Sequence, residues 1–502
     1  MAATLGGCVR PSPHEQGEPT STIGELDTSQ LTCAPLPPAT PEPPSNAIVI
    51  APSDDVASVV EGHVGGSTFW FERGVHTTSR AIQAKQGDHF VGAPDAVLDG
   101  QFTQPTAFTG NAANVVVDHL TVTRFGTPDG LGSINTAVVN RAAAPGWTVS
   151  NSIFTLNDGA ALFAGENSVT THNCFARNAQ YGVSVPSHRT DDQPRPIRRV
   201  QISENEFFGQ PRADLAGAGR CAGCSGAMKL WNSEQASVTK NSVHHNNGVG
   251  VWLDNNNVDA HVTDNDIYDN EAEGIVLETS YNSEVSRNHL RHNAWGAGRR
   301  RSQSDRFPDA AIFVSNSGGS QMLPGSPMID VSDNDVIDNF NGVTVFQDAN
   351  RFCGSSTDTS VGSCTLTGGS LGWCADALQG AEDAQAVLDT CHWNTTAIRV
   401  HHNTFVADLP EFQQCISRCA RNAIVATDAN TTATIRLPNG NTESTSNPVT
   451  PSDVRQRLTS PGAVDFSGNS YRGNWSFSLG TAEDVSDVEQ WRQSGYDQDS
   501  SH

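Results

Sequence analysis

Several residues that could act on a sugar occupy matching places in short glycine- or alanine-led segments. Aligned on their first residues, the segments read AMKLW, GVGVW, GIVLE, AIFVS and GVTVF, beginning at Ala227, Gly248, Gly274, Ala311 and Gly342. Their second and fourth positions are apolar, so in an extended strand the third and fifth positions face the other way. One outward column then starts at Lys229. The other holds Trp231, Trp252, Glu278, Ser315 and Phe346.

Two tryptophans on adjacent rungs, ~4.8 Å apart, would form a flat surface on which a sugar ring can stack. Asp254 follows Trp252 closely, and strand geometry places its carboxyl group roughly 8 Å from that of Glu278. That separation suits an inverting glycosidase. An insert covering the tryptophans would instead make them ordinary core. The predicted catalytic residues are Lys229, Asp254 and Glu278, and the predicted binding residues include Trp231, Trp252 and Phe346.

Arginines gather in two segments of an otherwise acidic chain. One holds Arg189, Arg195, Arg198, Arg199, Arg212 and Arg220, and the other holds Arg299, Arg300, Arg301 and Arg306. Because guanidinium groups bind carboxylates and sulfates through paired hydrogen bonds, Arg198, Arg199, Arg299 and Arg300 are predicted to bind an acidic glycan. Pairing with nearby Asp191, Asp192 and Asp305 is the competing interpretation.

A second group of polar and aromatic residues offers an alternative site: His244, His245, Tyr268, Arg291 and His292. Charged residues nearby alternate in sign from one repeat to the next, as Lys240, Asp264, Arg287 and Asp333 do. Stacked on neighbouring strands, such residues form ion pairs. We therefore interpret the alternating charges as stabilising rather than as a calcium or catalytic site.

A repeated asparagine defines the elements that must position these residues. The unit V-[ST]-x-N-x-φ-x-x-N, with φ apolar, occurs around Asn241, Asn265, Asn288 and Asn334, with intervals such as 265−241 = 24 and 288−265 = 23. Looser copies lie at Asn151, Asn173, Asn205, Asn403 and Asn469. A further asparagine follows five residues later in several units, as at Asn178, Asn246, Asn270, Asn293 and Asn339. This period predicts a solenoid with one repeat per turn and the asparagines stacked in a ladder.

The short strands between Asn and Gly bends favour a right-handed parallel β-helix. Leucine-rich repeats have a similar period, but they require Leu at fixed positions, where this chain has Val, Ile and Phe. The chain resembles the pectate-lyase-like superfamily over most of its length. SDDVASVVEG from Ser53 is similar to the helix that caps such folds, and AEDVSDVEQWRQSGYDQDS from Ala482 is similar to their closing helix and tail.

The resemblance implies an all-β protein, a right-handed parallel β-helix solenoid with an N-terminal helical cap, loop inserts and a Cys-rich insertion. It also implies a polysaccharide groove along one sheet. In polysaccharide lyases a cation neutralises the uronate carboxylate and a base removes the α-proton, often beside calcium. The scaffold also hosts hydrolases, epimerases, esterases and non-enzymes. Motifs of polygalacturonases, mannuronan epimerases and pectate lyases are not found in this sequence.

The expected organisation has five parts. They are a lipobox and Pro/Ser/Thr-rich tether (1–45), a cap and first rungs (46–115), the β-helix (116–352), a Cys-rich insertion with a rung near 398–406 (353–425), and the last rungs with a C-terminal cap (426–502).

Charge and cysteine usage restrict the partners and the compartment. The 502 residues carry a net charge of −25 with only three lysines, which argues against nucleic acid and acidic membranes. Leu5-Gly6-Gly7-Cys8 resembles a bacterial lipobox, although only seven residues precede Cys8 and a chance match is the alternative. Setting Cys8 aside leaves ten of eleven cysteines, which would pair as disulfides in an exported protein. Cys221 and Cys224 are expected to form a local disulfide rather than half of a zinc site.

Together these features predict a surface-anchored or secreted protein acting on an acidic polysaccharide, as a lyase or a glycoside hydrolase. The alternatives are a non-catalytic glycan-binding or structural protein of the cell envelope and, against the lipobox, a phage-type adhesin. The pattern assigns no metal ligands or cofactor, although calcium stays open, and membrane contact is expected only through the lipid anchor at Cys8. The oligomeric state is not determined by the sequence.

Overall fold

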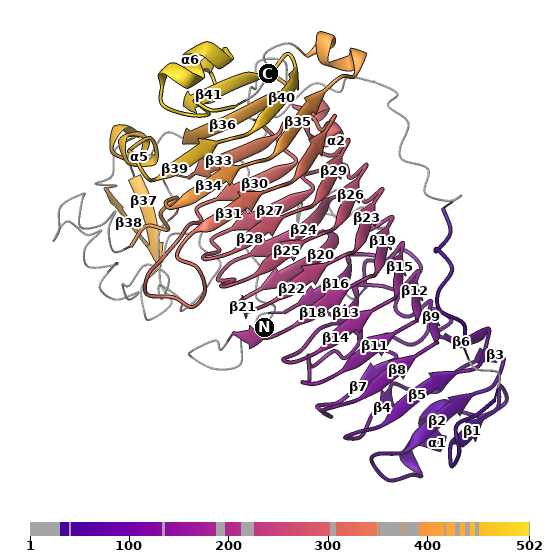
Figure 1. The fold of residues 1–502 in the computed structure, drawn as a ribbon. Helices are drawn as coiled ribbons and strands as arrows, with labels where there is room; N and C mark the ends of the chain where they lie inside the picture. Colours follow the sequence, from indigo (N-terminus) through magenta and orange to yellow (C-terminus); the bar gives the residue numbers. More distant parts are fainter. Residues whose placement is uncertain are drawn as a thin grey trace.

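The chain folds into a long right-handed parallel β-helix in which three sheets surround one apolar core (Figure 1). The computed structural model describes residues 31–39, 42–132, 136–186, 196–211, 225–301, 308–348, 351, 374, 391–415, 418–426, 432–436, 442–446 and 451–500. Each complete turn contributes one strand to each sheet, and each strand pairs in parallel with its equivalents on the turns before and after it.

The 13-stranded sheet is called sheet 1 here, the 12-stranded sheet is sheet 2 and the 11-stranded sheet is sheet 3. Sheet 1 contains β1 (Ile48–Ile50), β2 (Thr68–Phe71), β5 (His89–Gly92), β8 (Val116–Asp118), β11 (Thr148–Ser150), β14 (Val169–Thr171), β18 (Gln201–Ser203), β22 (Ser237–Thr239), β25 (His261–Thr263), β28 (Glu284–Ser286), β31 (Ile329–Ser332), β34 (Ile398–His401) and β39 (Val464–Ser467). Sheet 2 contains β3 (Gly74–His76), β6 (Ala96–Asp99), β9 (Thr121–Thr123), β12 (Ile153–Thr155), β15 (Cys174–Ala176), β19 (Glu206–Phe208), β23 (Ser242–His244), β26 (Asp266–Tyr268), β29 (His289–Arg291), β32 (Asp335–Ile337), β35 (Thr404–Ala407) and β40 (Ser470–Gly473).

Sheet 3 contains β10 (Ala137–Val139), β13 (Ala160–Phe163), β16 (Tyr181–Val185), β20 (Gly226–Trp231), β24 (Val249–Asp254), β27 (Ile275–Glu278), β30 (Ile312–Ser315), β33 (Val343–Gln347), β36 (Arg421–Ala426), β41 (Ser476–Gly480) and the antiparallel β42 (Val485–Ser486). Short pairs are made by β4 (Ile82–Gln83) with β7 (Phe108–Thr109), β17 (Ile197–Arg198) with β21 (Ser233–Glu234), and β37 (Thr432–Arg436) with β38 (Thr442–Ser446). The helices are α1 (Val56–Glu61), α2 (Trp295–Arg300), the 3-10 helix η4 (Pro410–Gln414), α5 (Pro451–Leu458) and α6 (Val488–Gln493).

The predicted core column is confirmed. Val243, Ile267, Leu290 and Val336 face one another on successive strands of sheet 2, and each is fully buried. Because a parallel strand repeats the position of its neighbour one rung away, one apolar residue per turn yields a continuous apolar stack. Burying each such side chain stabilises the fold by about 1.5–3 kcal/mol.

The asparagine ladder is also confirmed and is longer than its clearest repeats. It runs through Asn173, Asn205, Asn241, Asn265, Asn288, Asn334, Asn403 and Asn469 at the bends between sheets 1 and 2. At each step the side-chain amide and the backbone N–H of one asparagine both donate to the Oδ1 of the next, as Asn241 does to Asn265 at 3.0 and 2.9 Å. The amide also donates to a backbone carbonyl, so buried polar groups at these bends are satisfied.

A second ladder lies between sheets 2 and 3. Asn246, Asn270, Asn293 and Asn339 repeat the same bonds, and Asn157 donates to Asn178 earlier in the chain. A third row, made by Asn257, Ser280 and Ser317 between sheets 3 and 1, has no counterpart in the repeat found in the sequence. Two of its three positions hold serine instead of asparagine, so this row does not appear in the asparagine repeat.

One assignment in the first ladder is wrong by a residue. Ser152, not Asn151, occupies the ladder position, because the Ser152 N–H donates to Asn173 Oδ1 at 3.0 Å. Asn151 has a left-handed backbone with φ of 49° and donates to Asp118 on the surface. Left-handed residues directly precede the ladder positions on many turns. Asparagine tolerates a left-handed backbone and can therefore occupy the position just before the ladder. For this reason Asn151 resembles a ladder residue in the sequence, although Ser152 is the ladder residue.

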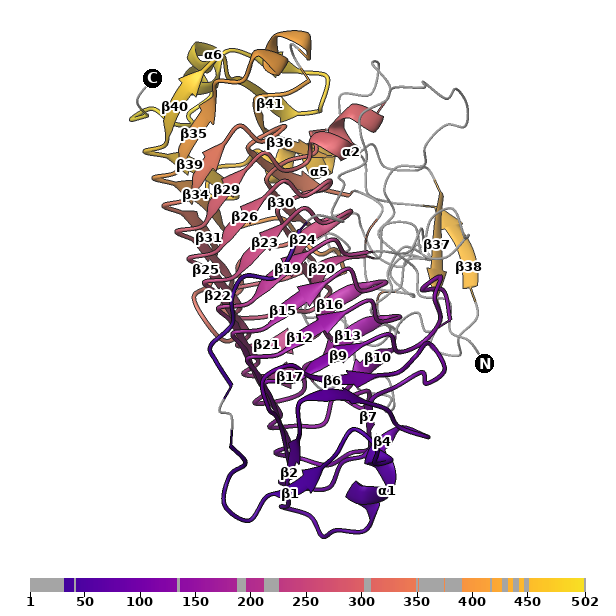
Figure 2. The same cartoon turned by 90° about the vertical axis from the view of Figure 1, so that its right-hand side faces the viewer.

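Both ends of the apolar core are closed by polar structure, as predicted (Figures 1 and 2). Helix α1 buries Val56 and Val60 against the first rungs. Helix α6 begins with a capping box between Asp487 and Gln490. The first ladder ends on the buried Asp497, whose Oδ1 accepts from the Asn469 amide at 2.8 Å. No helix within the described residues has the length and apolar character needed to cross a membrane.

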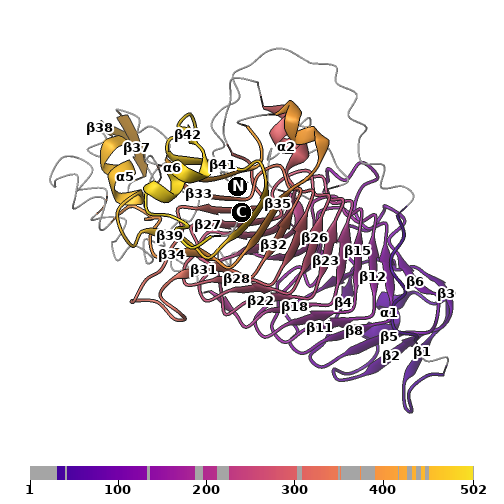
Figure 3. The ribbon, with the colours of Figure 1, turned by 45° about the horizontal axis from the view of Figure 1, so that its top comes forward.

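Six of the ten cysteines predicted to pair do so within the described residues, as Cys33–Cys174, Cys374–Cys391 and Cys415–Cys419. Cys8, Cys221, Cys224, Cys353 and Cys364 lie outside the described residues. The Cys33–Cys174 bond joins positions 141 residues apart and fastens residues 31–39 to sheet 2. We call residues 31–39 the N-terminal strap. Figure 3 shows it running along the sheet 2 side of the helix.

The ladder generates a direct prediction about stability. Replacing Asn288 with Ala leaves buried donors of Asn265 without an acceptor. It also removes the side-chain amide that donates to Asn334 Oδ1. We expect a loss of about 2–5 kcal/mol in the free energy of unfolding, because each unmatched buried group costs about 1–3 kcal/mol. Urea titration followed by circular dichroism measures the loss. The control Asn151→Gly lies outside the ladder and should cost under about 1 kcal/mol, because glycine tolerates the left-handed backbone at that position. Equal losses in the two variants would contradict the ladder's role.

Candidate functional site

The predicted catalytic residues lie on the outer face of sheet 3, in a register that differs by two residues from the predicted one. Lys229 is opposite Trp252, and Asp254 is opposite Glu278. Trp231 is opposite Asp254, so the predicted stacking of the two tryptophans is wrong. Inward and outward faces were nevertheless assigned correctly, because a strand has a period of two and a slip of two residues preserves the face.

The true register brings five of the predicted residues into contact. The Lys229 ammonium lies 2.7 Å from Asp254 Oδ2 and 3.9 Å from the centre of the Trp252 ring. The Trp252 indole N–H donates to Glu278 Oε2 at 3.2 Å. Trp231, which is partly exposed, has its ring 5.2 Å from the same ammonium. The lysine is therefore held between two indoles and a carboxylate.

Two residues absent from the predicted site complete this group. Arg351 pairs with Glu278 Oε1 and donates to Asn255 Oδ1 at 3.0 Å. The Asn255 amide donates in turn to Asp254 Oδ1 at 2.6 Å. Arg351 could not be found by spacing, since it follows Glu278 by 73 residues. We call Lys229, Trp252, Asp254, Asn255, Glu278 and Arg351 the charge cluster.

The charge cluster is enclosed. The side chains of its four charged residues are only 5–7% exposed. On one side, Ala297 of α2 packs with Trp252 and Val276. On the other, the Arg351 guanidinium lies 5.9 Å from the ring of the buried Trp393. Phe346, predicted to bind substrate, is 7% exposed and packs against Ala423 and Val425.

Two carboxylates and two cations give the charge cluster no net charge, and both oxygens of each carboxylate have partners. Those of Glu278 are Arg351 and Trp252, and those of Asp254 are Lys229 and Asn255. Burial raises the pKa of Asp254, and the nearby Glu278 carboxylate raises it further, while the Lys229 ammonium opposes both effects. The raised pKa brings the proton affinity of Asp254 closer to the range useful for proton transfer.

The predicted binding arginines are mostly paired with acids. Arg198 contacts Glu234 at 3.1 Å, Arg199 contacts Glu166 at 3.4 Å, and Arg300 pairs with Glu271. Arg299 differs, since it stacks on the Trp295 ring at 4.8 Å. The other arginines of these segments that lie outside the described residues are Arg189, Arg195, Arg212, Arg220 and Arg306.

The alternative site is a real cluster on the outer face of sheet 2 and its following bend. We call His244, His245, Tyr268, Asp269, Arg291 and His292 the histidine cluster. The rings of His244 and Tyr268 are stacked at 4.7 Å, and the Arg291 guanidinium lies 3.7 Å from the Tyr268 ring centre. These three residues face one another on successive strands. This cluster is more open than the charge cluster, with the His245 and His292 side chains 27% and 48% exposed.

Asp269 connects the two histidines of the bend. Its Oδ1 accepts from His292 Nδ1 at 2.6 Å, and its Oδ2 is 3.8 Å from His245 Nε2. Burial alone would raise the pKa of Asp269, but the hydrogen bond from His292 and the electrostatic influence of His292, His245 and Arg291 lower it overall. Burial lowers the pKa of His245, Asp269 opposes this, and His244, Arg291 and His292 add to the lowering. At neutral pH, Asp269 is therefore ionised and His245 is neutral.

Charges beside the first ladder pair across the rungs, as predicted. Arg287 contacts Asp264 at 3.0 Å, Arg291 contacts Asp266 at 3.0 Å, and His289 lies 3.6 Å from Asp335. The Arg287 guanidinium lowers the pKa of Asp264. These exposed pairs stabilise the fold by little individually.

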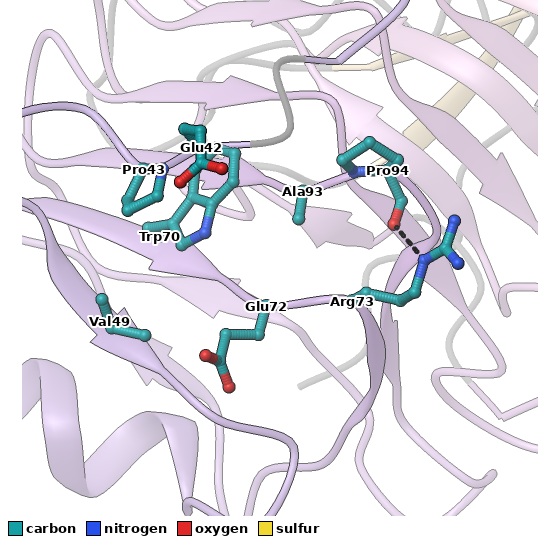
Figure 4. A pocket seen from close by; sticks show the side chains of 8 residues that line it. All are labelled: Glu42, Pro43, Val49, Trp70, Glu72, Arg73, Ala93 and Pro94. Atoms are coloured by element: carbon teal, nitrogen blue, oxygen red, sulfur yellow. Dashed lines mark hydrogen bonds between the residues drawn. The ribbon is translucent and has the colours of Figure 1, made fainter.

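The described residues bring three metal-ligating side chains within 4.8 Å of one another only at Cys33, Cys174 and Glu206. Both sulfurs of that group are consumed by their disulfide. A pocket of about 530 Å³ lies far from both clusters, on the first rungs, where Trp70, Glu42 and Glu72 line it (Figure 4). Arg73 points away from its centre and bonds to the Pro94 carbonyl.

The role of Lys229 in the charge cluster can be tested through stability. Lys229 lowers the pKa of Asp254, so Lys229→Met should raise it further. An acid with a raised pKa keeps its proton in the fold, so stability falls as pH rises from its unfolded value through the folded pKa. We expect Lys229→Met to lower the melting temperature at pH 8 more than at pH 5, with a loss of about 3–5 kcal/mol from the unpaired buried charge.

Differential scanning fluorimetry across this pH range measures the effect. Adding Asp254→Asn to Lys229→Met should restore most of the loss. The exposed Lys240→Met is the matched control and should show no pH-dependent loss. A pH-independent loss in Lys229→Met would contradict the coupling between Lys229 and Asp254.

Comparisons with known proteins agree with this architecture. A family model described as a right handed beta helix region matches residues 135–365. Similar solved structures include the A-module of mannuronan C-5 epimerase AlgE6 from Azotobacter vinelandii (11% identity, 90% of this chain and 94% of that one, TM-score 0.42). Others are a mannuronic acid specific polysaccharide family 6 lyase from human gut microbiota (13%, 85% and 86%, 0.48) and the periplasmic alginate epimerase AlgG (12%, 75% and 78%, 0.40). No curated protein matches the sequence. At 11–13% identity, these similarities concern the fold alone.

Proposed function

We propose that the protein acts on an acidic polysaccharide by removing a proton next to a uronate carboxylate, as lyases do. The observation that carries the proposal is a buried pair of carboxylates held against two cations. Glu278 is bound by Arg351 and Trp252, Asp254 is bound by Lys229 and Asn255, and burial raises the pKa of Asp254. A carboxyl group with a raised pKa beside two cations suits abstraction of an acidic C–H.

The burial of the charge cluster supports a role beyond stability. The equivalent outward positions on neighbouring rungs hold Val276, Phe313, Thr344, Ser315 and Phe346. The β-helix thus accommodates uncharged residues on this face. Four buried charges cost several kcal/mol in desolvation, which their mutual attraction offsets only in part. Buried charged groups with strongly shifted pKa values are typical of catalytic sites.

The residues would divide the reaction as follows. Arg351 neutralises the uronate carboxylate, which makes the neighbouring C–H more acidic. Asp254 accepts that proton, the C4–O4 bond breaks, a C4=C5 double bond forms, and the Lys229 ammonium protonates the leaving oxygen. The proton then returns from Asp254 to Lys229 along their 2.7 Å contact, which restores the starting state. Trp231 offers a ring face for stacking a sugar beside Lys229.

A glycoside hydrolase remains the competing reaction. It would need Glu278 as a second acid or base, released from Arg351 and Trp252, just as elimination needs Asp254 to turn from its own partners to the substrate. A non-catalytic glycan-binding or structural protein is the alternative at the level of function, with the charge cluster then serving to fasten Arg351 to sheet 3.

Activity on uronate polymers tests the proposal. The wild-type protein should release products that absorb in the ultraviolet, because elimination creates a conjugated double bond. Asp254→Asn should lower kcat by about 10²–10⁴-fold, the usual contribution of a positioned proton acceptor. Asp266→Asn on sheet 2 is the matched control and should keep full activity.

Thermal melts establish that each variant is folded. New reducing ends without ultraviolet absorbance would overturn elimination in favour of hydrolysis. Binding without turnover on a panel of uronate-containing and sulfated glycans would overturn catalysis altogether.

We also propose that the protein is exported and lipidated at Cys8. Three disulfides among the described residues support an oxidising compartment, and Leu5-Gly6-Gly7-Cys8 supplies the motif. Expression from the full upstream reading frame should give a membrane-bound form whose N-terminal peptide carries acyl chains by mass spectrometry. The control Cys8→Ser should remain unmodified and be released. An unmodified Cys8 in exported protein would contradict the anchor.

A further inference from the structure

We infer a second glycan-binding site, on the outer side of α2 and the neighbouring histidine cluster, where Arg299 receives the carboxylate or sulfate of an acidic sugar. The inference rests on the proposed acidic polysaccharide but not on catalysis. Helix α2 lies beside the ends of β26 and β29 (Figure 1). It packs Ala297 against the charge-cluster side of the molecule and presents Arg299 to solvent.

Arg299 is set apart from its neighbours by its partners. Arg300 pairs with Glu271, Arg301 with Asp309, and Arg291 with Asp266. Arg299 has no carboxylate partner within the described part of the chain, and its contact is with the Trp295 ring at 4.8 Å. Stacking on an indole leaves the edge of a guanidinium available for two parallel hydrogen bonds to an anion. It also restricts the side chain, which lowers the entropy lost on binding.

The indole beneath Arg299 is rigidly held. The Trp295 N–H donates to the Asp338 carbonyl at 2.8 Å, and its ring contacts Phe340 and Phe412 at 5.4 and 5.2 Å. Gly298 permits this arrangement, because a Cβ there would lie 2.3 Å from the Phe340 ring. The helix can therefore lie close to the last turns, which fixes the direction in which Arg299 is presented.

The histidine cluster adds a hydrogen-bond acceptor on the same surface. Glu206 accepts the Ala34 N–H at 2.7 Å and contacts His244 Nε2 at 3.2 Å. A carboxylate only accepts, so His244 Nε2 carries the proton and its Nδ1 accepts from His245 Nδ1 at 3.0 Å. The remaining nitrogen of neutral His245, Nε2, is then unprotonated. It faces Asp269 Oδ2 at 3.8 Å, too far for a hydrogen bond.

His292 and Trp295 connect the two recognition groups. Their ring centres are 5.8 Å apart, and His292 Nδ1 is hydrogen-bonded to the same Asp269 that faces His245. A sugar can therefore place an anionic group on Arg299, a ring over exposed His292, and a hydroxyl as donor to His245 Nε2. Anion, ring face and hydroxyl donor together describe a uronate or a sulfated sugar unit.

Binding of short oligosaccharides tests this site. Isothermal titration with an oligouronate, a sulfated oligosaccharide and a neutral oligosaccharide of equal length should show binding of one or both acidic probes only. Arg299→Ala should weaken the affinity for those probes by about tenfold or more, as expected for a charge-assisted pair worth about 1.5–3 kcal/mol. Arg300→Ala, on the same helix but paired with Glu271, is the matched control and should change affinity less than about twofold.

Further variants separate binding from folding. Arg299→Gln keeps a polar side chain without the positive charge and should lose affinity as Arg299→Ala does, while retaining the wild-type melting temperature. His245→Ala should weaken both acidic probes about threefold, in keeping with one neutral hydrogen bond. The preferred probe identifies the anion as carboxylate or sulfate. Equal affinities for wild type, Arg299→Ala and Arg299→Gln, or equal losses in the Arg299 and Arg300 variants, would overturn the inference.

The same variants distinguish this site from the catalytic proposal. Asp254→Asn should abolish elimination and leave the Arg299-dependent binding intact. Arg299→Ala should raise KM for long polymers and leave kcat unchanged. If no ultraviolet-absorbing product forms but Arg299 still controls binding, the binding site stands and the lyase fails. If elimination proceeds and Arg299 affects neither affinity nor KM, the lyase stands and the binding site fails.

Discussion

The stacked amides at the bends are the constraint on which the rest of the molecule depends. Each turn of a β-helix must reverse its backbone inside a packed structure, where unpaired N–H groups are costly. The asparagine at each bend meets this need for the neighbouring turn, and the same Oδ1 accepts both a side-chain and a backbone donor. Once the bends are superposed, every strand between them is superposed too. The outward columns of both candidate sites are aligned by this repetition.

The fold could be predicted from the sequence because its signal is periodic, whereas the site could be predicted only in part. Asparagine spacing located the ladder and the facing of each strand. The predicted register on sheet 3 was correct for β27, β30 and β33 and wrong for β24, because the leading Gly248 does not occupy the position equivalent to Gly274. Counting from the second ladder gives the correct pairing: 252−246 = 6 and 276−270 = 6. On a later turn the same column gives 344−339 = 5, so the bend fixes the register only between turns of equal length.

Arg351 shows a different limit of the sequence. Its partners Glu278 and Asn255 lie 73 and 96 residues earlier, and no repeat relates them. Insertions leave the helix and return at places that periodicity does not encode, so contacts made by their residues are invisible to it. The same holds for Arg299, whose distinction from Arg300 is a matter of neighbours in space. From the sequence the two arginines look alike. In the structure Arg300 pairs with the Glu271 carboxylate, and Arg299 stacks on the Trp295 indole.

The N-terminal strap also has a mechanical consequence. A chain pulled from its N-terminus would ordinarily peel the first rungs one at a time, which requires little force because each rung separates in turn. Here the covalent link between Cys33 and Cys174 delivers the load to β15 on the outer face of sheet 2, well inside the solenoid. The rungs before it, including α1 and the first strands, then carry no tension. In a molecule tethered upstream of Cys33, drag would load the solenoid at β15, near its middle. Several rungs would then have to shear at the same time instead of separating one after another.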